Sequence, residues 1–181
     1  MNRFLISAVV LIIALTAVAN AEAQKSVKAF GSYRNVYSDG EHESGYSLDL
    51  WSYGGKLIGI IRVHRGLVGD APAGMLDDVA YSRSTHKLSF RSKVTIGLFS
   101  DLTHKEVPSQ DLVTVTGVLT RARLSGRVVI VNKLCDKGCR ESHHVVLRRE
   151  RQQTSYLKNF RNYDAWKESV KIILDTYGPQ W

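Results

Sequence analysis

The sequence predicts a mainly β protein, an antiparallel meander barrel of about eight strands with a C-terminal amphipathic helix. Three observations lead to this prediction. Short runs in which apolar and polar residues alternate recur between Val27 and Arg149, as in strands with one buried face. Turn-forming residues separate these runs at short intervals. In the last part of the chain, from about 155 to 177, the apolar spacing changes to that of a helix.

Alternation with a period of two is clearest at 88–96, where apolar positions alternate with polar ones such as Ser89 and Arg91. The Gly54-Gly55 pair is a two-residue hairpin signal in front of another such run. The expected strands cover residues 28–36, 44–51, 57–63, 76–81, 88–96, 113–119, 124–130 and 145–147. Their apolar faces should line the interior of the barrel around Ile61, Phe90, Val94, Val115 and Val128.

The C-terminal segment has the spacing of an amphipathic helix. Its large apolar residues fall on one face and comprise Tyr156, Phe160, Tyr163, Trp166, Val170, Ile173 and Tyr177. We expect the regular helix to cover Ala165 to Thr176, with a shorter helical stretch before it, so that helical structure spans about 155–177. Asp164 is the expected N-cap, and Gly178-Pro179 is a stop signal. The aromatic face should pack on the protein's own barrel.

The first residues have the features of a cleavable secretory signal peptide. Arg3 provides a positive charge, and the run from Phe4 to Val18 is uncharged and almost wholly apolar. Ala19-Asn20-Ala21 offers a small-x-small cleavage pattern and Ala21-Glu22-Ala23 offers the same pattern two residues on, so the mature chain should begin at Glu22 or Gln24. The run is shorter than the roughly twenty apolar residues that a membrane-spanning helix needs. We therefore expect a signal peptide at 1–23 and a single domain at 24–181. The mature protein should be periplasmic or secreted and should have no transmembrane anchor.

The two cysteines, Cys135 and Cys139, lie close together in the sequence. In an oxidising compartment the expected state is a disulfide, which would close a short loop and mainly fix the shape of a turn. Free thiols remain an alternative. So does a metal site with His143 and His144, although adjacent histidines on a strand point to opposite faces and could not easily bind one ion. We predict a disulfide, with neither a metal site nor a cofactor.

The formal net charge of the full chain is +8, with a sequence pI near 9.6. A surplus of this size can attract anionic lipid, glycan or protein partners. The only dense basic cluster is Arg148-Arg149-Glu150-Arg151, and the other basic residues are dispersed as on an ordinary solvated surface. The charge therefore keeps an anionic envelope component as a candidate partner, and we expect no nucleic acid.

No catalytic or cofactor-binding motif stands out in the sequence. The most enzyme-like group comes from two neighbouring predicted strands, on which Asp49, Arg62 and His64 could converge. Trp51 would lie beside them. In the simpler arrangement, which we favour, Asp49 and Arg62 are an outward cross-strand pair and Trp51 lies beneath the C-terminal helix. We retain all four residues as candidate ligand contacts, and an enzyme centred on Asp49, Arg62 and His64 as an alternative.

The connection at 65–75 combines glycines, a proline and apolar residues. It could fold over the mouth of the barrel as a lid, or it could be an ordinary wide hairpin loop. Asp70 lies in this connection and is included among the candidate ligand contacts. His42 and Glu43 belong to the 39–43 turn and are most simply solvent-exposed.

A glycine and an aromatic residue mark the first strand (Gly31-Ser32-Tyr33), a meander follows, and a helix comes after the last strand. This layout resembles that of lipocalin-like (calycin-type) barrels. The run from Gly45 to Trp51 and the terminal 178–181 are similar to those of small exported bacterial proteins. Lipocalin-like barrels often hold one small ligand inside. The resemblance implies a non-enzymatic exported barrel that binds a small apolar or amphipathic ligand. A basic envelope protein that binds an anionic partner is the alternative.

Overall fold

The computed structural model describes residues 25–100, 105–135, 139–151 and 157–181. The predicted signal peptide, at 1–23, lies outside these residues. Among the described helices, none has both the length and the apolar character that crossing a membrane requires.

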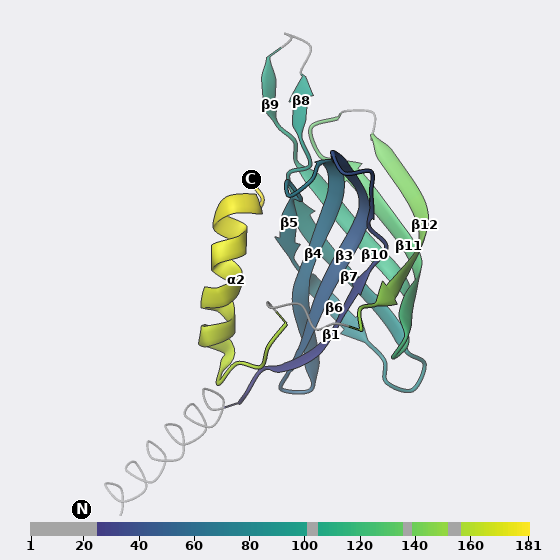
Figure 1. The fold of residues 1–181 in the computed structure, drawn as a ribbon, viewed down its shortest axis with the longest axis vertical. Coiled ribbons are helices and arrows are strands. Elements are labelled where there is room, and N and C mark those ends of the chain that lie inside the picture. Colours follow the sequence, from purple (N-terminus) through teal and green to yellow (C-terminus); the bar gives the residue numbers. More distant parts are fainter. Residues whose placement is uncertain (1–24, 101–104, 136–138, 152–156) are drawn as a thin grey trace, which may run out of the picture.

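Most of the described chain forms one antiparallel sheet (Figure 1). Its strands are β1 (Lys28–Arg34), β2 (Tyr37–Ser38), β3 (His42–Tyr53), β4 (Lys56–Leu67), β5 (Ala73–Met75), β6 (Asp77–Tyr81), β7 (Lys87–Val94), β10 (Asp111–Leu119), β11 (Arg123–Asn132) and β12 (Arg140–Arg149). Their order is β5-β4-β3-β1-β12-β11-β10-β7-β6, with β2 paired to β3. The connection from β7 to β10 carries a separate hairpin of β8 (Leu98–Ser100) and β9 (Glu106–Pro108). Apart from β1 and β12, strands that are neighbours in the sheet are also neighbours in the order of the main sheet strands along the chain. This arrangement is the predicted meander.

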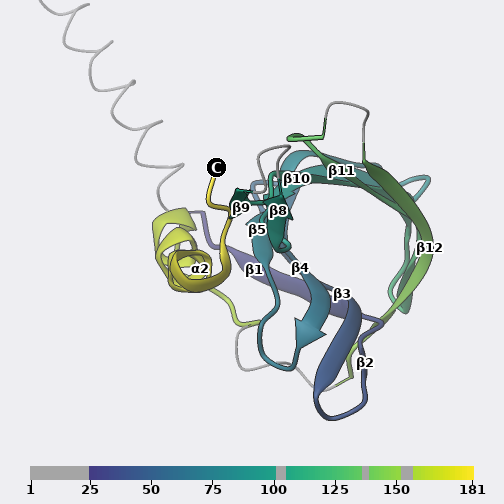
Figure 2. The ribbon, with the colours of Figure 1, turned by 90° about the horizontal axis from the view of Figure 1, so that it is seen from above.

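The sheet curls into a nearly closed barrel (Figure 2). At one edge β5 pairs with β4, and at the other edge β6, which follows directly, pairs with β7. At Gly74 the edges come so close that an added Cβ would lie 2.1 Å from the carbonyl oxygen of Lys93. The barrel path thus contains β5 in addition to the predicted strands. The last residues of the 65–75 connection form β5, which pairs with β4 in the barrel wall. β4 and β5 are thus joined as a hairpin, the second of the two arrangements considered for this connection.

The interior of the barrel is packed with apolar side chains from both halves of the sheet. The residues predicted to line it, Ile61, Phe90, Val94, Val115 and Val128, are all buried in this core. They point inward because every second side chain of a strand lies on the same face. The prediction of the core from the alternating pattern is confirmed.

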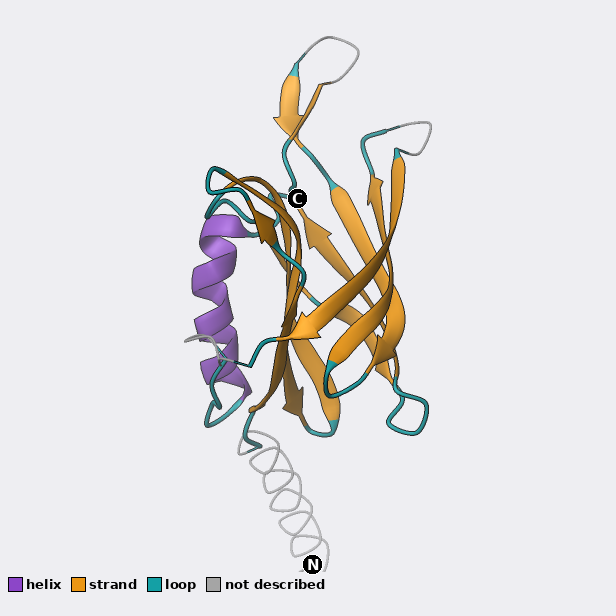
Figure 3. Cartoon of the chain, turned by 45° about the vertical axis from the view of Figure 1, so that its right-hand side comes forward, coloured by secondary structure: helices purple, strands orange, loops and turns teal. Residues whose placement is uncertain are grey.

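The described C-terminal helix, α2 (Tyr163–Tyr177), packs against the outer face of β3, β4 and β5 (Figure 3). A second apolar cluster forms between helix and sheet. At its centre the ring centroids of Trp51 and Trp166 lie 5.9 Å apart. The indole Nε1 of Trp51 donates a hydrogen bond of 3.0 Å to the carbonyl oxygen of Lys158. The aromatic face of the helix therefore packs on the protein's own barrel, as predicted.

The regular helix starts two residues before the predicted Ala165, but the shorter helical stretch expected in front of it is absent from the described residues 157–162. The helix begins at Tyr163, and its N-cap is Asn162 rather than Asp164, which lies in the first turn. The start expected near 155 lies outside the described residues, and 157–162 are not helical. The reason is that Phe160 forms a β-bridge with the N-terminal segment, which holds its backbone extended. The end agrees with the prediction, because the helix stops at Gly178.

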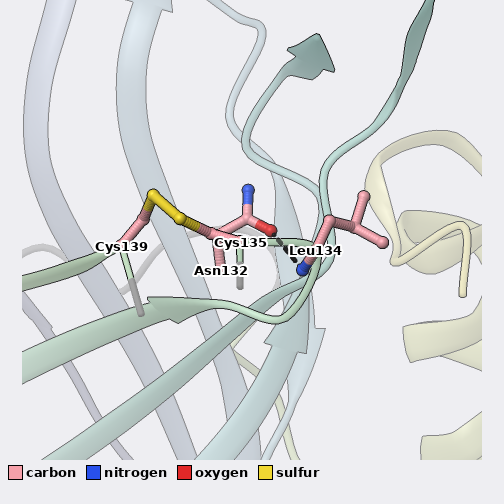
Figure 4. The surroundings of a disulfide bond; sticks show 4 residues. All are labelled: Asn132, Leu134, Cys135 and Cys139. Carbon is pink, nitrogen blue, oxygen red and sulfur yellow. Dashed lines mark hydrogen bonds between the residues drawn. A yellow bond between two sulfur atoms is a disulfide. The ribbon is translucent and has the colours of Figure 1, made fainter. Parts of the chain in front are cut away.

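Cys135 and Cys139 form the predicted disulfide (Figure 4). It lies in the connection between β11 and β12. On the same connection the side-chain oxygen of Asn132 accepts a hydrogen bond of 2.9 Å from the backbone N–H of Leu134. The backbone N–H of Asn132 donates to the carbonyl oxygen of Cys139 at 3.1 Å. The disulfide therefore supports a local turn rather than joining distant parts of the fold.

Candidate functional site

A connected set of polar side chains lies on the outer face of β1, β3 and β4. Asp49 on β3 is only 3% exposed. Its carboxylate accepts a hydrogen bond of 2.7 Å from Arg62 on β4 and one of 2.6 Å from the hydroxyl of Ser32 on β1. The side chain of Arg62 is 18% exposed, so this ion pair is largely shielded from water. A buried carboxylate is tolerated when it is paired and hydrogen-bonded in this way.

The set continues through Glu150, which follows β12. The Glu150 carboxylate accepts a hydrogen bond of 3.0 Å from Arg34 and lies 3.5 Å from the Ser32 hydroxyl oxygen. Ser32 therefore links the Asp49 carboxylate to the Glu150 carboxylate. The set contains two carboxylates and two guanidinium groups, so their charges compensate each other.

Three further side chains form a hydrogen-bonded series on β3 and β4. The Nδ1 of His64 lies 2.7 Å from a carboxylate oxygen of Glu43, and its Nε2 lies 2.9 Å from the hydroxyl oxygen of Ser47. Glu43, Gly45 and Ser47 share one face of β3. Gly45 is directly opposite His64 and has a φ of +125°, a conformation that favours glycine. A side chain at Gly45 would also collide with the chain after β1, because an added Cβ would lie 2.7 Å from the carbonyl oxygen of Asn35.

The environment of His64 favours its neutral imidazole. Burial lowers the pKa of His64 below its ordinary value of 6.5, and the charges of Arg34 and Arg62 act in the same direction. The hydrogen bond and charge of Glu43 oppose them, but burial is the larger effect. In a neutral ring whose Nδ1–H donates to Glu43, Nε2 is the acceptor for the hydroxyl of Ser47.

The structure brings three of the predicted site residues to one face of the sheet. Asp49 and Arg62 form a cross-strand ion pair on the outer face as favoured, although it is largely shielded from water, and His64 lies two residues beyond Arg62 on the same face of β4. Trp51 is 2% exposed beneath α2 and belongs to the packing between helix and barrel. Asp70 is exposed between β4 and β5 and lines a separate cavity of about 220 Å³. Whether any of these residues contacts a ligand stays a prediction.

The sequence-based prediction missed Glu43 and Ser47. It assigned Glu43 to an exposed turn at 39–43, but β3 begins at His42, and the Glu43 side chain is only 17% exposed. The sequence does contain a pattern that could have located them. From Glu43 onward, polar or small residues occupy every second position, opposite the apolar face that includes Leu48. Extending the strand by a few residues would have placed Glu43 and Ser47 together.

A second feature is a groove of about 880 Å³ beside the short β1–β12 pairing, called the arginine groove below. The arginines that line it are Arg121, Arg123, Arg148, Arg149 and Arg151. Glu150 is the only acid among its described lining residues. The apolar lining residues are Ala29, Phe30, Ala122, Val146 and Leu157. The basic cluster seen in the sequence is therefore joined by Arg121, in the turn between β10 and β11, and by Arg123, at the start of β11.

Two of these arginines oppose each other directly. Arg123 on β11 and Arg148 on β12 are register partners. Like charges in this position destabilise an antiparallel pair. Within the described part of the chain, neither of them, nor Arg121 or Arg151, forms an ion pair with a carboxylate. Arg149 differs, because its guanidinium donates to a backbone carbonyl of β1 at 2.9 Å. A bound anion would compensate the uncancelled charge.

No protein-family model matches the chain, and comparisons with curated proteins and with solved structures find no match either. The described residues contain no cluster of three or more histidine, cysteine or acidic side chains arranged to hold a metal ion. The two sites are therefore interpreted from their own chemistry. They adjoin each other, since Ser32 and Glu150 belong both to the polar set and to the lining of the groove.

Proposed function

We propose that this protein is an exported barrel of lipocalin-like layout that binds an anionic phospholipid in the arginine groove without transforming it. It acts in the periplasm or outside the cell, after removal of its signal peptide. The observation that carries the proposal is the direct opposition of Arg123 and Arg148 in the wall of the groove. A phosphate placed between them converts repulsion into charge-assisted hydrogen bonds.

The lining of the groove suits both ends of such a ligand. A guanidinium group is planar and can donate two parallel hydrogen bonds to a phosphate. Next to the arginines, Val146 lies on the outer face of β12 and is 44% exposed. Phe30, which is partly exposed, adds apolar surface to the same lining. The headgroup therefore binds the arginines, and the first part of an acyl chain covers the apolar residues.

The barrel interior is a poorer place for the ligand. Core residues such as Leu48, Ile61 and Val113 are completely buried against one another. A barrel of this size can be filled entirely by its own side chains. The apolar ligand that the resemblance implies is therefore assigned to the outer groove, where it combines with the anionic partner expected from the net charge.

The proposal is tested by flotation of the mature protein with phosphatidylglycerol vesicles and with phosphatidylcholine vesicles. We expect binding to the anionic vesicles only, weakening as salt screens the interaction. Arg148→Glu should weaken this binding by about tenfold or more, since about 1.4 kcal/mol corresponds to a factor of ten. Arg83→Glu is the matched control, because Arg83 is exposed in the turn before β7 and does not line the groove. It changes the net charge equally and should retain binding.

Stability provides an independent readout for the same variant. Arg148→Glu replaces a like-charged pair with an attractive one, so the free energy of unfolding should rise by about 0.2–1 kcal/mol. A variant that is more stable and yet binds less tightly has lost a functional contact and not its fold. Equal loss of binding in both variants, or equal binding to neutral vesicles, would contradict the proposal.

A further inference from the structure

The series Ser47, His64 and Glu43 has the order of groups that activates a serine hydroxyl. The hydroxyl oxygen lies 2.9 Å from one ring nitrogen of His64, and the carboxylate lies 2.7 Å from the other. The carboxylate fixes the tautomer in which Nε2 faces the hydroxyl without a proton. Such a triad is recognised by its geometry and not by its position in a sequence.

The strand register determines this geometry. Ser47 and Glu43 lie on the same face of β3, and His64 lies on β4 opposite Gly45, midway between them. His64 is therefore a diagonal neighbour of both residues, at a separation that a ring and a carboxylate can bridge. The side chains of His64 and Glu43 are 10% and 17% exposed, so the hydrogen bond between them is shielded from water.

Ser47 is partly exposed and lies between two cations. Its register partner on β1 is Arg34, and its register partner on β4 is Arg62. In a strand the three residues form one row across the sheet, with their side chains on the same face. Arg34 and Arg62 each use one guanidinium nitrogen on a carboxylate, that of Glu150 or Asp49. Their remaining N–H groups are the donors that we assign to the carbonyl oxygen that the hydroxyl attacks. Positioned cations and donors of this kind stabilise an oxyanion.

We propose that Ser47 is a nucleophile, that His64 is its general base, and that the site cleaves carboxylic esters. The Oγ of Ser47 attacks the carbonyl carbon, and its proton moves to Nε2 of His64. The alcohol leaves with that proton, and an acyl group remains on Oγ. Water then attacks the acyl group and gives a proton to His64, which returns it to Ser47 as the carboxylic acid departs. Glu43 is a positioning residue that orients the imidazole. Ester and water are the only reactants.

The protonation state of His64 agrees with this role. A base must be unprotonated at the working pH, and burial keeps the pKa of His64 below its ordinary value. The charged groups that face His64 are Glu43, Arg34 and Arg62. The two arginines disfavour the imidazolium form, and Glu43 favours it. The ester-cleaving role is independent of lipid binding in the arginine groove, because neither Ser47 nor His64 lines that groove.

The test is covalent labelling of the mature protein with a fluorophosphonate, followed by intact mass measurement and peptide mapping. Ser47 Oγ displaces fluoride from phosphorus, so the mass rises by that of the probe less hydrogen fluoride. We expect one label, on Ser47, and none in Ser47→Ala. Ser44→Ala is the matched control, since Ser44 lies on the same strand and is exposed. It should be labelled at the wild-type rate.

Variants of the other two residues separate a chemical role from a structural one. His64→Gln should be labelled at least about a hundredfold more slowly, since general-base catalysis contributes a factor of about 10² to 10⁴. Glu43→Gln should slow labelling and shift its acid limb to lower pH, because Glu43 raises the pKa of His64. Absence of label on Ser47 in the folded wild-type protein, or equal labelling of Ser47 and Ser44, would overturn the proposal, whatever the variants do.

Discussion

The buried pair of Asp49 and Arg62 allows a quantitative test of the polar set. In Asp49→Ala the guanidinium of Arg62 loses its partner at 2.7 Å, and the hydroxyl of Ser32 loses its acceptor at 2.6 Å. Breaking a buried ion pair by removing one partner costs about 3–5 kcal/mol. Because the Arg62 side chain is 18% exposed and can reach some water, we expect the lower end, about 3 kcal/mol.

A double-mutant cycle isolates the contribution of the pair. With Asp49→Ala, Arg62→Ala and the double variant, the interaction energy should be about 1.5–3 kcal/mol. The surface pair of Arg91 and Asp78 is the control, since these side chains are 57% and 67% exposed. Its interaction energy should be below about 1 kcal/mol.

The measurement is urea unfolding followed by tryptophan fluorescence, with the free energy extrapolated to water at an unchanged slope. The comparison between the two cycles removes errors that are common to the extrapolations. If Asp49→Ala costs less than about 1 kcal/mol, or the two pairs show equal interaction energies, Asp49 is not a buried anchor of the outer face.

Four other results are expected. Trp166→Ala should cost about 3–5 kcal/mol in urea unfolding, because it empties the centre of the cluster beneath α2. Gly74→Ala should cost about 1–3 kcal/mol and reduce near-ultraviolet circular dichroism, because the added Cβ collides with the backbone of β7. Replacing Cys135 and Cys139 by serine should cost at most about 2 kcal/mol in thermal unfolding, since the loop they close is short. The pKa of His64 is lower in the folded than in the unfolded chain, so its contribution to stability is complete above pH 6.5 and is lost as the pH falls below that value. His64→Gln should therefore flatten the stability profile between pH 7 and pH 5.

The barrel core could be predicted from the sequence because strand burial has a local signature. At Phe90 and Val94 the alternation of apolar and polar residues is enough to identify the inward face. The apolar face of the helix around Trp166 could be predicted for the same reason, because its spacing is visible within a short stretch of sequence. The extended backbone just before the helix is not determined locally, because the bridge between Phe160 and Val27 joins residues that are far apart in the chain.

The candidate site could be predicted in part. Asp49 and Arg62 come together because a two-residue turn fixes the register of β3 and β4. The contributions of Ser32 and Glu150 could not be foreseen, since they depend on how β1 lies between β3 and β12. Glu43, the partner of His64, was missed because β3 extends beyond the barrel core, and the residues of this extension do not show the apolar alternation that marks a strand.

The sequence by itself determined the strand periodicity, the amphipathic helix, the local disulfide and the basic charge, since each depends on residues that are near in the chain. Only the tertiary structure decided the rest. The first strand, β1, pairs with the last strand, β12, in the middle of the strand order, while β5 and β6 form the two edges of the sheet. That pairing creates the arginine groove and connects Glu150 to the outer polar set, because contacts between distant strands follow from register and curvature rather than from local preference.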